Sequence, residues 1–271
     1  MRENAFDIVE RGVGQPLVLV PGVQGRWEYS RGLVDALARS YRVITFSLHE
    51  QRETRKAAPC GIDVFADQVD AALDRLGIAH APVVGVSFGG LVALRWAATR
   101  PERASALVMI SAPGPGWHLR PRHEVYARLP WLFGPLFLVE SPFRLRQEIL
   151  TALPGWPARR RYLGEQWRTA ASARVSLGGM AARALAIGAY DRAADCPRVT
   201  APTLVVLGDE RLDHVTGTGG TSEYAQLIPG SRLVRMARTG HLGSVTRADD
   251  CAAIVRGFLV DAQKDAHHSA A

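Results

Sequence analysis

The stretch "PVVGVSFGGLVALRWAA", residues 82–98, decides the fold of this chain. Residues 82–86 form a short continuous apolar run, which is typical of a strand buried on both faces of a parallel sheet. The apolar residues that follow Gly89 recur at helical spacing. The abrupt change at Ser87, between Gly85 and Gly89, therefore predicts a strand–turn–helix unit with the serine on a strained backbone. Such strain often marks a functional site.

Ser87 has two interpretations at this point. A serine that precedes a helix can simply cap its N-terminus. A serine in the pattern G-x-S-x-G, between a strand and a helix, can instead be a nucleophile. The second role requires a histidine that takes the proton and an acid that orients the histidine.

Length and composition fit one large α/β domain or two small ones. The chain has 271 residues, of which 47% are hydrophobic and 22% are charged. Its beginning lacks the apolar segment of a secretory signal, and its longest apolar run, residues 129–139, is too short to span a bilayer. Cys60, Cys196 and Cys251 are scattered and lack zinc-ligand spacing. We therefore expect a cytoplasmic protein with no membrane span and no metal site.

The net charge of +7 comes almost entirely from arginine, since Lys56 and Lys264 are the only lysines among 33 basic residues. Arginine suits phosphate recognition, but so uneven a ratio is typical of codon bias. The sequence contains no helix-turn-helix, aromatic RNA-binding signature or zinc finger. We therefore expect no nucleic-acid partner.

Short apolar strands alternate with helical segments along most of the chain. Strands are expected at residues 16–22, 42–48, 82–86, 104–113, 201–209 and 231–239, and helices at 31–40, 61–78, 91–98 and 249–262. This alternation predicts a mostly parallel, twisted sheet with helices on both faces. Ligands bind such sheets beyond the carboxyl ends of the strands.

The alternation fails between residues 113 and 190, a region that holds four of the six tryptophans. An insertion of this length is not a simple connection. It predicts a helical cap, inserted after the strand that follows the serine helix. We thus expect an α/β core of residues 1–112 and 191–262, a cap of residues 113–190, and a flexible tail of residues 263–271.

Polar residues follow two of the predicted strands. "TGHLG", residues 239–243, places His241 on a glycine-flanked loop before the last helix. "DERLDHV", residues 209–215, offers Asp209, Glu210 and Asp213 as acids. The order serine, acid, histidine is the one expected of the α/β-hydrolase fold. The remaining histidines that we considered lack a strand–loop–helix setting; they are His49, His80, His118, His123 and His214.

The chain resembles the α/β-hydrolase superfamily over nearly its whole length. The resemblance rests on four segments in order: "LVLVPGVQGRW", "GVSFGG", "PTLVVLGDERLDHV" and "TGHLGSVT". It implies that Ser87 is the nucleophile and His241 the general base. A serine nucleophile excludes relatives that form an ester on an aspartate. No G-x-G-x-x-G follows a strand, so an enzyme without cofactor or metal is implied.

The resemblance also suggests the acid. Family members carry it in a segment like D-x-x-V-P, and Asp213 begins a similar stretch in which Thr216 and Gly217 replace the usual end. We favour Asp213 and keep Glu210 and Asp209 as alternatives.

The oxyanion hole needs two backbone N–H groups that point at the developing charge. The resemblance implies Phe88, directly after the nucleophile, and Val23 in the first turn. The usual His-Gly-x of that turn is replaced by Pro21-Gly22-Val23. Proline has no N–H, but the expected donor is the residue two positions later.

The cap holds 11 arginines and four glutamates. This excess favours a solvated helix face, with an anionic substrate as the alternative. The apolar run at 129–139, with Trp117 and Trp156, fits either the cap's own core or a substrate pocket. We expect a serine hydrolase that cleaves a small carboxylic ester through an acyl-enzyme. The alternatives are a C–C bond or enol-lactone hydrolase, and a non-catalytic binding protein on the same scaffold.

Overall fold

The computed structural model describes residues 7–49, 61–217 and 220–269. Its centre is a seven-stranded sheet with the order β1-β3-β2-β4-β5-β6-β7. The strands are β1 (Ile8–Arg11), β2 (Pro16–Val20), β3 (Arg42–Phe46), β4 (Ala81–Val86), β5 (Ala104–Ile110), β6 (Thr203–Leu207) and β7 (Arg232–Arg235). All neighbours are parallel except β1 and β3, which are antiparallel. The predicted fold class is confirmed, with β1 as an edge strand that we did not predict.

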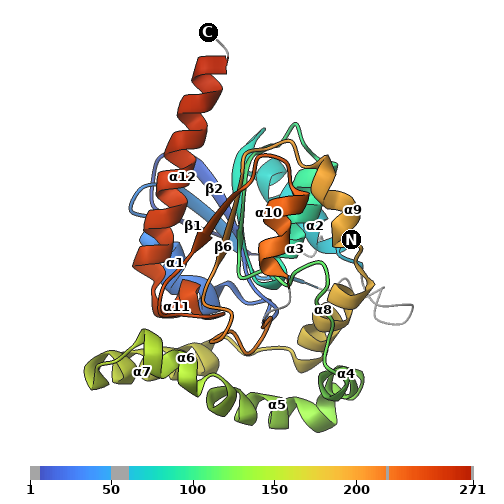
Figure 1. Cartoon of the computed structure of the whole chain (residues 1–271), viewed down its shortest axis with the longest axis vertical. Helices are drawn as coiled ribbons and strands as arrows, with labels where there is room; N and C mark the ends of the chain where they lie inside the picture. Colours follow the sequence, from blue (N-terminus) through green and yellow to red (C-terminus); the bar gives the residue numbers. More distant parts are fainter. Residues whose placement is uncertain (1–6, 50–60, 218–219, 270–271) are drawn as a thin grey trace.

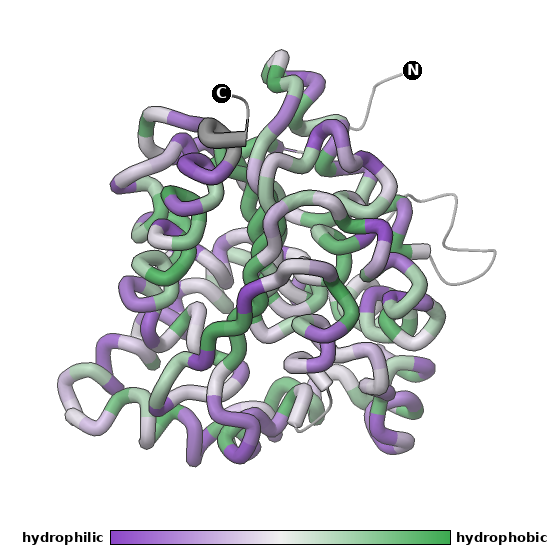
Figure 2. The backbone as a smooth tube through the Cα atoms, turned by 45° about the horizontal axis from the view of Figure 1, so that its top comes forward, coloured by the Kyte–Doolittle hydropathy of each residue, from purple (hydrophilic) through white to green (hydrophobic). Residues whose placement is uncertain are grey.

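Helices cover both faces of the sheet (Figure 1). On one face α1 (Arg31–Leu37) and α12 (Ala248–Ser269) pack on the strands, and on the other α2 (Asp63–Arg75) and α3 (Phe88–Thr99) do so. Most residues of β2 and β4 are buried, and those of β2 alternate between the two hydrophobic clusters. Figure 2 shows these strands of hydrophobic residues running through the middle of the molecule. The continuous apolar runs of the central strands follow from burial on both faces.

The turn from β4 to α3 depends on its two glycines. A Cβ at Gly85 would lie 2.1 Å from the carbonyl oxygen of Gly89, and a Cβ at Gly89 would lie 2.2 Å from the carbonyl oxygen of Val20. Real Cβ atoms do not approach backbone this closely. Ser87 between them has φ 54° and ψ −117°, a region that costs a non-glycine residue of the order of 1–3 kcal/mol. The strained turn expected from the sequence is present.

Five helices follow β5 and lie together beyond the carboxyl edge of the sheet (Figure 1). We call them the inserted helices: α4 (Pro121–Arg128), α5 (Pro130–Arg144), α6 (Arg146–Ala152), α7 (Trp156–Ser172) and α8 (Leu177–Ala189). Proline occupies the first turn of α4, α5 and α7, where its missing N–H costs nothing. No helix within the described ranges has the length and apolar character that crossing a membrane requires.

The apolar run at 129–139 does not form a core of its own. Pro130, Gly134 and Phe137 line a cavity, whereas Trp131 and Leu132 are 74% and 68% exposed. Trp156 is exposed as well. The run is apolar on every side of the helix, so its sequence gave no periodicity from which to choose the buried side.

Short elements complete the chain: η1 (Trp27–Ser30), α9 (Arg192–Asp195), η3 (Cys196–Arg198), η4 (Thr221–Glu223), α10 (Tyr224–Leu227) and α11 (Gly243–Thr246). The tail predicted from residue 263 is helical as far as Ser269, because α12 continues through it. Residues 270 and 271 lie outside the described residues, as does Cys60. Cys196 and Cys251 are buried free thiols.

Candidate active site

Ser87 and His241 meet at the carboxyl edge of the sheet. Ser87 stands at the end of β4 and His241 follows β7, and the Ser87 hydroxyl donates to Nε2 of His241 at 3.1 Å. Ser87 occupies the N-cap position of α3, but its side chain makes no capping bond to the described backbone of that helix. The hydroxyl is thus directed at a base and is free of the capping role considered above.

Asp213 is the acid that the structure brings to the histidine. Nδ1 of His241 donates to Oδ2 of Asp213 at 3.4 Å, a long bond of the kind that tightens once substrate is bound. The alternatives lie elsewhere. Asp209 accepts the backbone N–H of Arg211, and Glu210 faces Arg235.

The loop after β6 holds Asp213 as a carboxylate. Its Oδ1 accepts the N–H groups of Val215 at 2.8 Å and Thr216 at 2.7 Å. Burial works against ionisation, but the charge of His241 and the bonds from His241 and Thr216 outweigh it and hold the pKa of Asp213 well below its usual value. Thr216, which departs from the family segment, supplies its hydroxyl and its N–H to this carboxylate.

His241 is correspondingly basic. Burial lowers its pKa, but the charge of Asp213 and the hydrogen bond to it outweigh burial, and the charge of Glu148 adds to them, so the pKa lies above the ordinary 6.5. A proton taken from Ser87 would therefore be stabilised on the imidazole.

The turn that follows β2, which contains Gly22 and Val23, lies beside Ser87. A Cβ at Gly22 would be 3.6 Å from the Cβ of Ser87, and Val23 lines the same cavity as Ser87. A buried arginine on α8 supports this turn: Arg183 donates to the carbonyl oxygens of Val23 at 2.8 Å and Gln24 at 3.1 Å. These two bonds fix the orientation of the two peptide units that follow Val23. Phe88, the other expected donor, begins α3, where helix N–H groups lack intrahelical acceptors.

Glu148 on α6 is a buried group that our sequence analysis missed. Its Oε1 accepts the N–H of Gly240 at 2.7 Å, the N–H of Leu242 at 2.6 Å and the hydroxyl of Thr239 at 3.0 Å. These residues stand on both sides of His241. Glu148 lies in a partly polar segment some 90 residues before His241, and nothing in that segment predicts that it is buried. Only the packing of α6 against the histidine loop reveals the contact. Arg183 was missed for the same reason.

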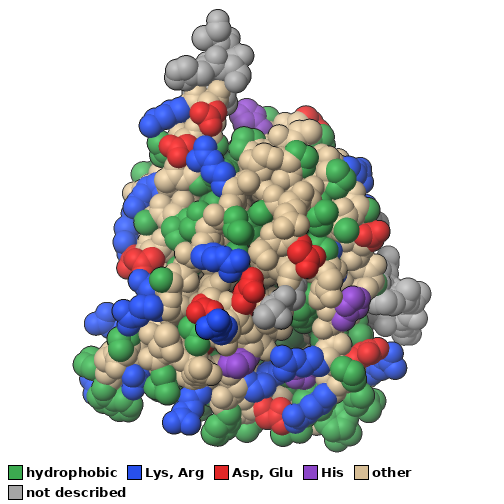
Figure 3. Space-filling view, in the orientation of Figure 1, with side chains coloured by type: hydrophobic (Ala, Val, Ile, Leu, Met, Phe, Trp, Pro, Cys, Tyr) green, Lys and Arg blue, Asp and Glu red, His purple; other side chains and the backbone are tan. Residues whose placement is uncertain are grey.

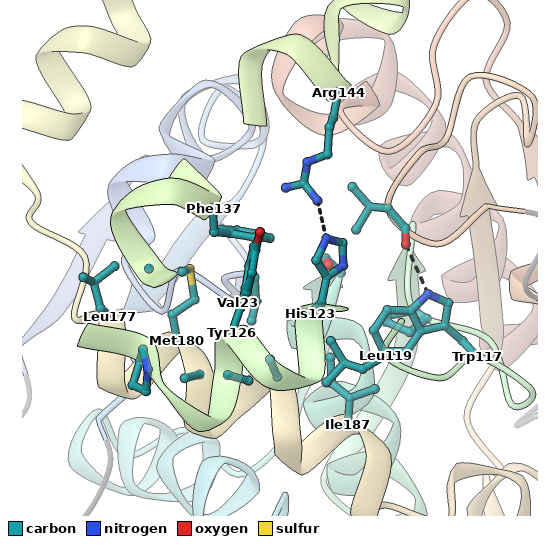
Figure 4. Close-up of a pocket in the computed structure, with 18 of the residues that line it drawn as sticks. Val23, Trp117, Leu119, His123, Tyr126, Phe137, Arg144, Leu177, Met180 and Ile187 are labelled. Atoms are coloured by element: carbon teal, nitrogen blue, oxygen red, sulfur yellow. Dashed lines mark hydrogen bonds between the residues drawn. The ribbon is translucent and has the colours of Figure 1, made fainter. Parts of the chain in front are cut away.

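A cavity of about 140 Å³ extends from Ser87 into the inserted helices. Apolar side chains from α4, α5 and α8 form most of its wall (Figure 4); among them are Tyr126, Phe137, Leu177, Met180 and Ile187. Trp117 lines it as well and donates its indole N–H to the carbonyl oxygen of Val215. An apolar wall with a few polar groups is typical of a small-molecule site.

Two of the polar groups in this wall are His123 of α4 and Arg144 of α5. They lie together (Figure 4), with Nη1 of Arg144 2.8 Å from Nε2 of His123. His123 lines the cavity, while His118 is exposed. A second, more open cavity of about 540 Å³ adjoins the first and shares Arg144 and His214 with it. Arg120 and Arg146 also line this second cavity.

Comparison with known proteins agrees with this geometry. Residues 15–136, which include β2 to β5 and Ser87, match the family model described as alpha/beta hydrolase fold. Over these residues the chain is similar to the α/β-hydrolases, and its sheet has their fold.

Individual relatives are diverse. A polyketide synthase of Burkholderia thailandensis, ThaQ, is 30% identical over 93% of this chain, but the chain spans only 12% of that protein. RutD of Stutzerimonas stutzeri, named as a carbamate hydrolase, is 26% identical, with 90% of this chain and 91% of RutD covered. The enol-lactonase of Burkholderia xenovorans superposes with a TM-score of 0.76 at 21% identity, covering 94% of this chain and 96% of its own. At that identity the superposition shows the fold alone.

Proposed function

We propose that this protein is a serine hydrolase that cleaves a small ester or related carbonyl compound. The observation that carries the proposal is the 3.1 Å contact between the Ser87 hydroxyl and the imidazole of His241, on a strained turn that faces a cavity. The hydrolases among its relatives support the general class of reaction.

In this mechanism Oγ of Ser87 attacks the substrate carbonyl while Nε2 of His241 takes its proton. Asp213 holds the imidazole in the required tautomer and stabilises the imidazolium. The N–H groups of Val23 and Phe88 receive the oxyanion. The imidazolium then protonates the leaving group, which departs and leaves an acyl-serine. A water molecule, deprotonated by His241, attacks this ester and returns Ser87 to its free form.

The inserted helices act as a cap that selects the substrate. Their apolar cavity wall fits the hydrocarbon part of an acyl group. Arg120, Arg144 and Arg146 line the wider opening, and none has an ion-pair partner among the described residues. Burial lowers the pKa of Arg144; the charge of Glu140 opposes this shift, while the charges of Arg120 and Arg122 add to it. An anionic group on the substrate would relieve this repulsion.

Labelling with a fluorophosphonate probe tests the nucleophile. We expect the wild-type protein to be labelled and the Ser87→Ala protein to remain unlabelled while it unfolds at the same temperature. Absence of labelling in a folded wild-type protein would refute the proposal, and would favour a binding protein on a hydrolase scaffold.

A panel of p-nitrophenyl esters then tests the substrate. We compare neutral acyl chains of increasing length with chains that end in a carboxylate. Loss of any preference for the carboxylate in Arg144→Gln would support an anionic substrate group at Arg144. An enol-lactone substrate is the second candidate, because the enol-lactonase shares the fold over nearly its whole length; faster turnover of enol lactones than of every open-chain ester would favour it.

A further inference from the structure

The outward side of α5 is entirely apolar. Its exposed residues are Trp131, Leu132, Pro135, Leu136, Leu138, Val139, Pro142 and Phe143. Its polar residues, Glu140, Ser141 and Arg144, are partly buried on the inward side. This is the reverse of an ordinary surface helix, whose apolar stripe faces the core. A continuous exposed patch of this kind marks a surface that something else covers.

α7, which lies on the other side of α6, also exposes apolar side chains (Figure 1). Trp156, Leu163 and Trp167 are 67%, 51% and 79% exposed, at spacings that place them along one stripe of the helix. Exposed arginines accompany them, among them Arg160, Arg161 and Arg168. In Figure 3 hydrophobic side chains lie along the lower edge of the molecule, over the inserted helices, with arginines between them.

The charge of the inserted segment indicates which kind of partner covers this apolar face. The segment from residue 113 to 190 carries 11 arginines against four glutamates. A second copy of the chain docked through this face would bring two cationic surfaces together, which is unfavourable. An anionic bilayer attracts the arginines and accepts tryptophan, phenylalanine and leucine at its boundary with water.

We propose that α5 and α7 dock the protein on an anionic lipid surface. The docking face continues into the site, because Phe143 also lines the second cavity beside Arg144. A lipophilic ester held in the bilayer would then lie close to the opening beside Arg144. This interfacial role goes beyond the proposed hydrolysis, and binding to lipid is measurable without turnover.

Cosedimentation with vesicles tests the docking face. We expect the protein to bind vesicles that contain phosphatidylglycerol, to bind pure phosphatidylcholine more weakly, and to be released by salt. The triple variant Trp131→Gln, Val139→Gln and Phe143→Gln should bind at least about tenfold more weakly, since each change removes an apolar side chain from the contact. Val13→Gln is the matched control: Val13 is 84% exposed but precedes β2, at the opposite edge of the sheet.

Three results would overturn the proposal. They are no binding of the wild-type protein to phosphatidylglycerol vesicles, equal binding of the folded triple variant, and a dimer in light scattering that the triple variant converts to monomer. The last result would assign the face to a second copy.

A different observation concerns the loop that carries His241. The carboxylate of Glu148 is fully buried and accepts three hydrogen bonds from residues on both sides of His241. Its second oxygen is buried with no partner in the described structure. Burial of a carboxylate oxygen without a hydrogen bond costs free energy, and another contribution must offset that cost. Burial raises the pKa of Glu148, whereas the N–H groups of Leu242 and Gly240 and the charge of His241 oppose this shift. We infer that Glu148 is a positioning residue, through which α6 fixes the backbone of the histidine loop and, when ionised, adds a negative charge beside the imidazole. This inference rests on the proposed function of His241.

The groups that face His241 and Glu148 are few. Asp213 approaches the imidazole from the loop after β6, Glu148 from α6, and Tyr162 of α7 lies near Glu148. Glu148→Gln keeps an oxygen acceptor for the same donors but removes the charge. Glu148→Ala removes both. The two variants therefore separate position from electrostatics.

For Glu148→Ala we expect kcat to fall roughly ten- to a hundredfold with KM little changed, because a small displacement of a general base is costly. For Glu148→Gln we expect a smaller loss in kcat, with the titration of His241 moved to lower pH by up to about one unit. An NMR titration of the His241 ring measures that shift without substrate. Glu165→Gln is the control, since Glu165 is an exposed glutamate on α7.

Wild-type kcat in folded Glu148→Ala, together with an unshifted His241 titration in Glu148→Gln, would overturn the inference. The NMR titration distinguishes this failure from a failure of the proposed function, because it does not depend on any turnover.

Discussion

Trp96 and Trp131 show how differently the two halves of this molecule use the same residue. Trp96 on α3 is fully buried and donates its indole N–H to Asp70, whereas Trp131 on α5 is 74% exposed. The sheet and its flanking helices are organised around their own core. Among the inserted helices, α5 exposes apolar residues and keeps its polar residues partly buried. The buried tryptophan belongs to the core that holds Ser87 in place, whereas the exposed one belongs to the face for which we propose contacts with other molecules.

The largest expected effect lies at the sheet edge. Asp213→Asn should lower kcat by about 10⁴-fold, because the amide favours the wrong tautomer of His241 and no longer stabilises the imidazolium. Steady-state kinetics on the best ester of the panel measures it. Asp209→Asn and Glu210→Gln, whose side chains face Arg211 and Arg235, should stay within roughly tenfold of the wild type. A severe loss in either control with a mild loss in Asp213→Asn would assign the acid elsewhere.

The next effect tests the contrast between the tryptophans directly. Trp96→Ala should cost about 3–5 kcal/mol of unfolding free energy, since it leaves a cavity in the core. Trp131→Ala should stay within about 0.5 kcal/mol, as is usual for surface positions. Urea denaturation of both variants provides the measurement. A large loss in Trp131→Ala would mean that α5 is covered within the protein as it exists in solution.

The sequence predicted the sheet better than the inserted helices, for physical reasons. Central strands buried on both faces must be continuously apolar, and Gly85 and Gly89 must be glycines because backbone passes within 2.2 Å of their absent Cβ atoms. Both constraints are visible in local sequence. β1 was missed because its four residues, IVER, are partly polar and lie at the sheet edge.

The candidate site divides in the same way. Ser87, Asp213 and His241 follow strands whose ends must meet, so their proximity was predictable from topology. Glu148 and Arg183 act on the site from the inserted helices, and their contacts depend on how those helices pack. No local pattern distinguishes a buried glutamate on α6 from an exposed one.

A smaller effect concerns pH. Because only neutral His241 can accept the proton, kcat/KM should rise with pH through an apparent pKa above 6.5, the direction in which Asp213 and Glu148 move it. A profile of kcat/KM from about pH 5 to 9 measures this rise, which is the acidic limb of the profile. The limb should move to lower pH in Asp213→Asn, where the neighbouring charge is lost. A flat profile would contradict a histidine base.

The smallest effect again contrasts the two regions, now through glycine. Gly164 lies within α7, is exposed, and an added Cβ there would meet no atom within 4 Å. Gly164→Ala should therefore raise the unfolding free energy by about 0.5–1 kcal/mol, since alanine loses less backbone entropy in a helix. The same exchange at Gly89 forces a methyl group against the carbonyl of Val20 and should destabilise strongly. Thermal unfolding of both variants measures the contrast. Should Gly164→Ala destabilise the protein, α7 must be packed against a partner or bent at this glycine in solution, and the docking face would need to be redrawn around it.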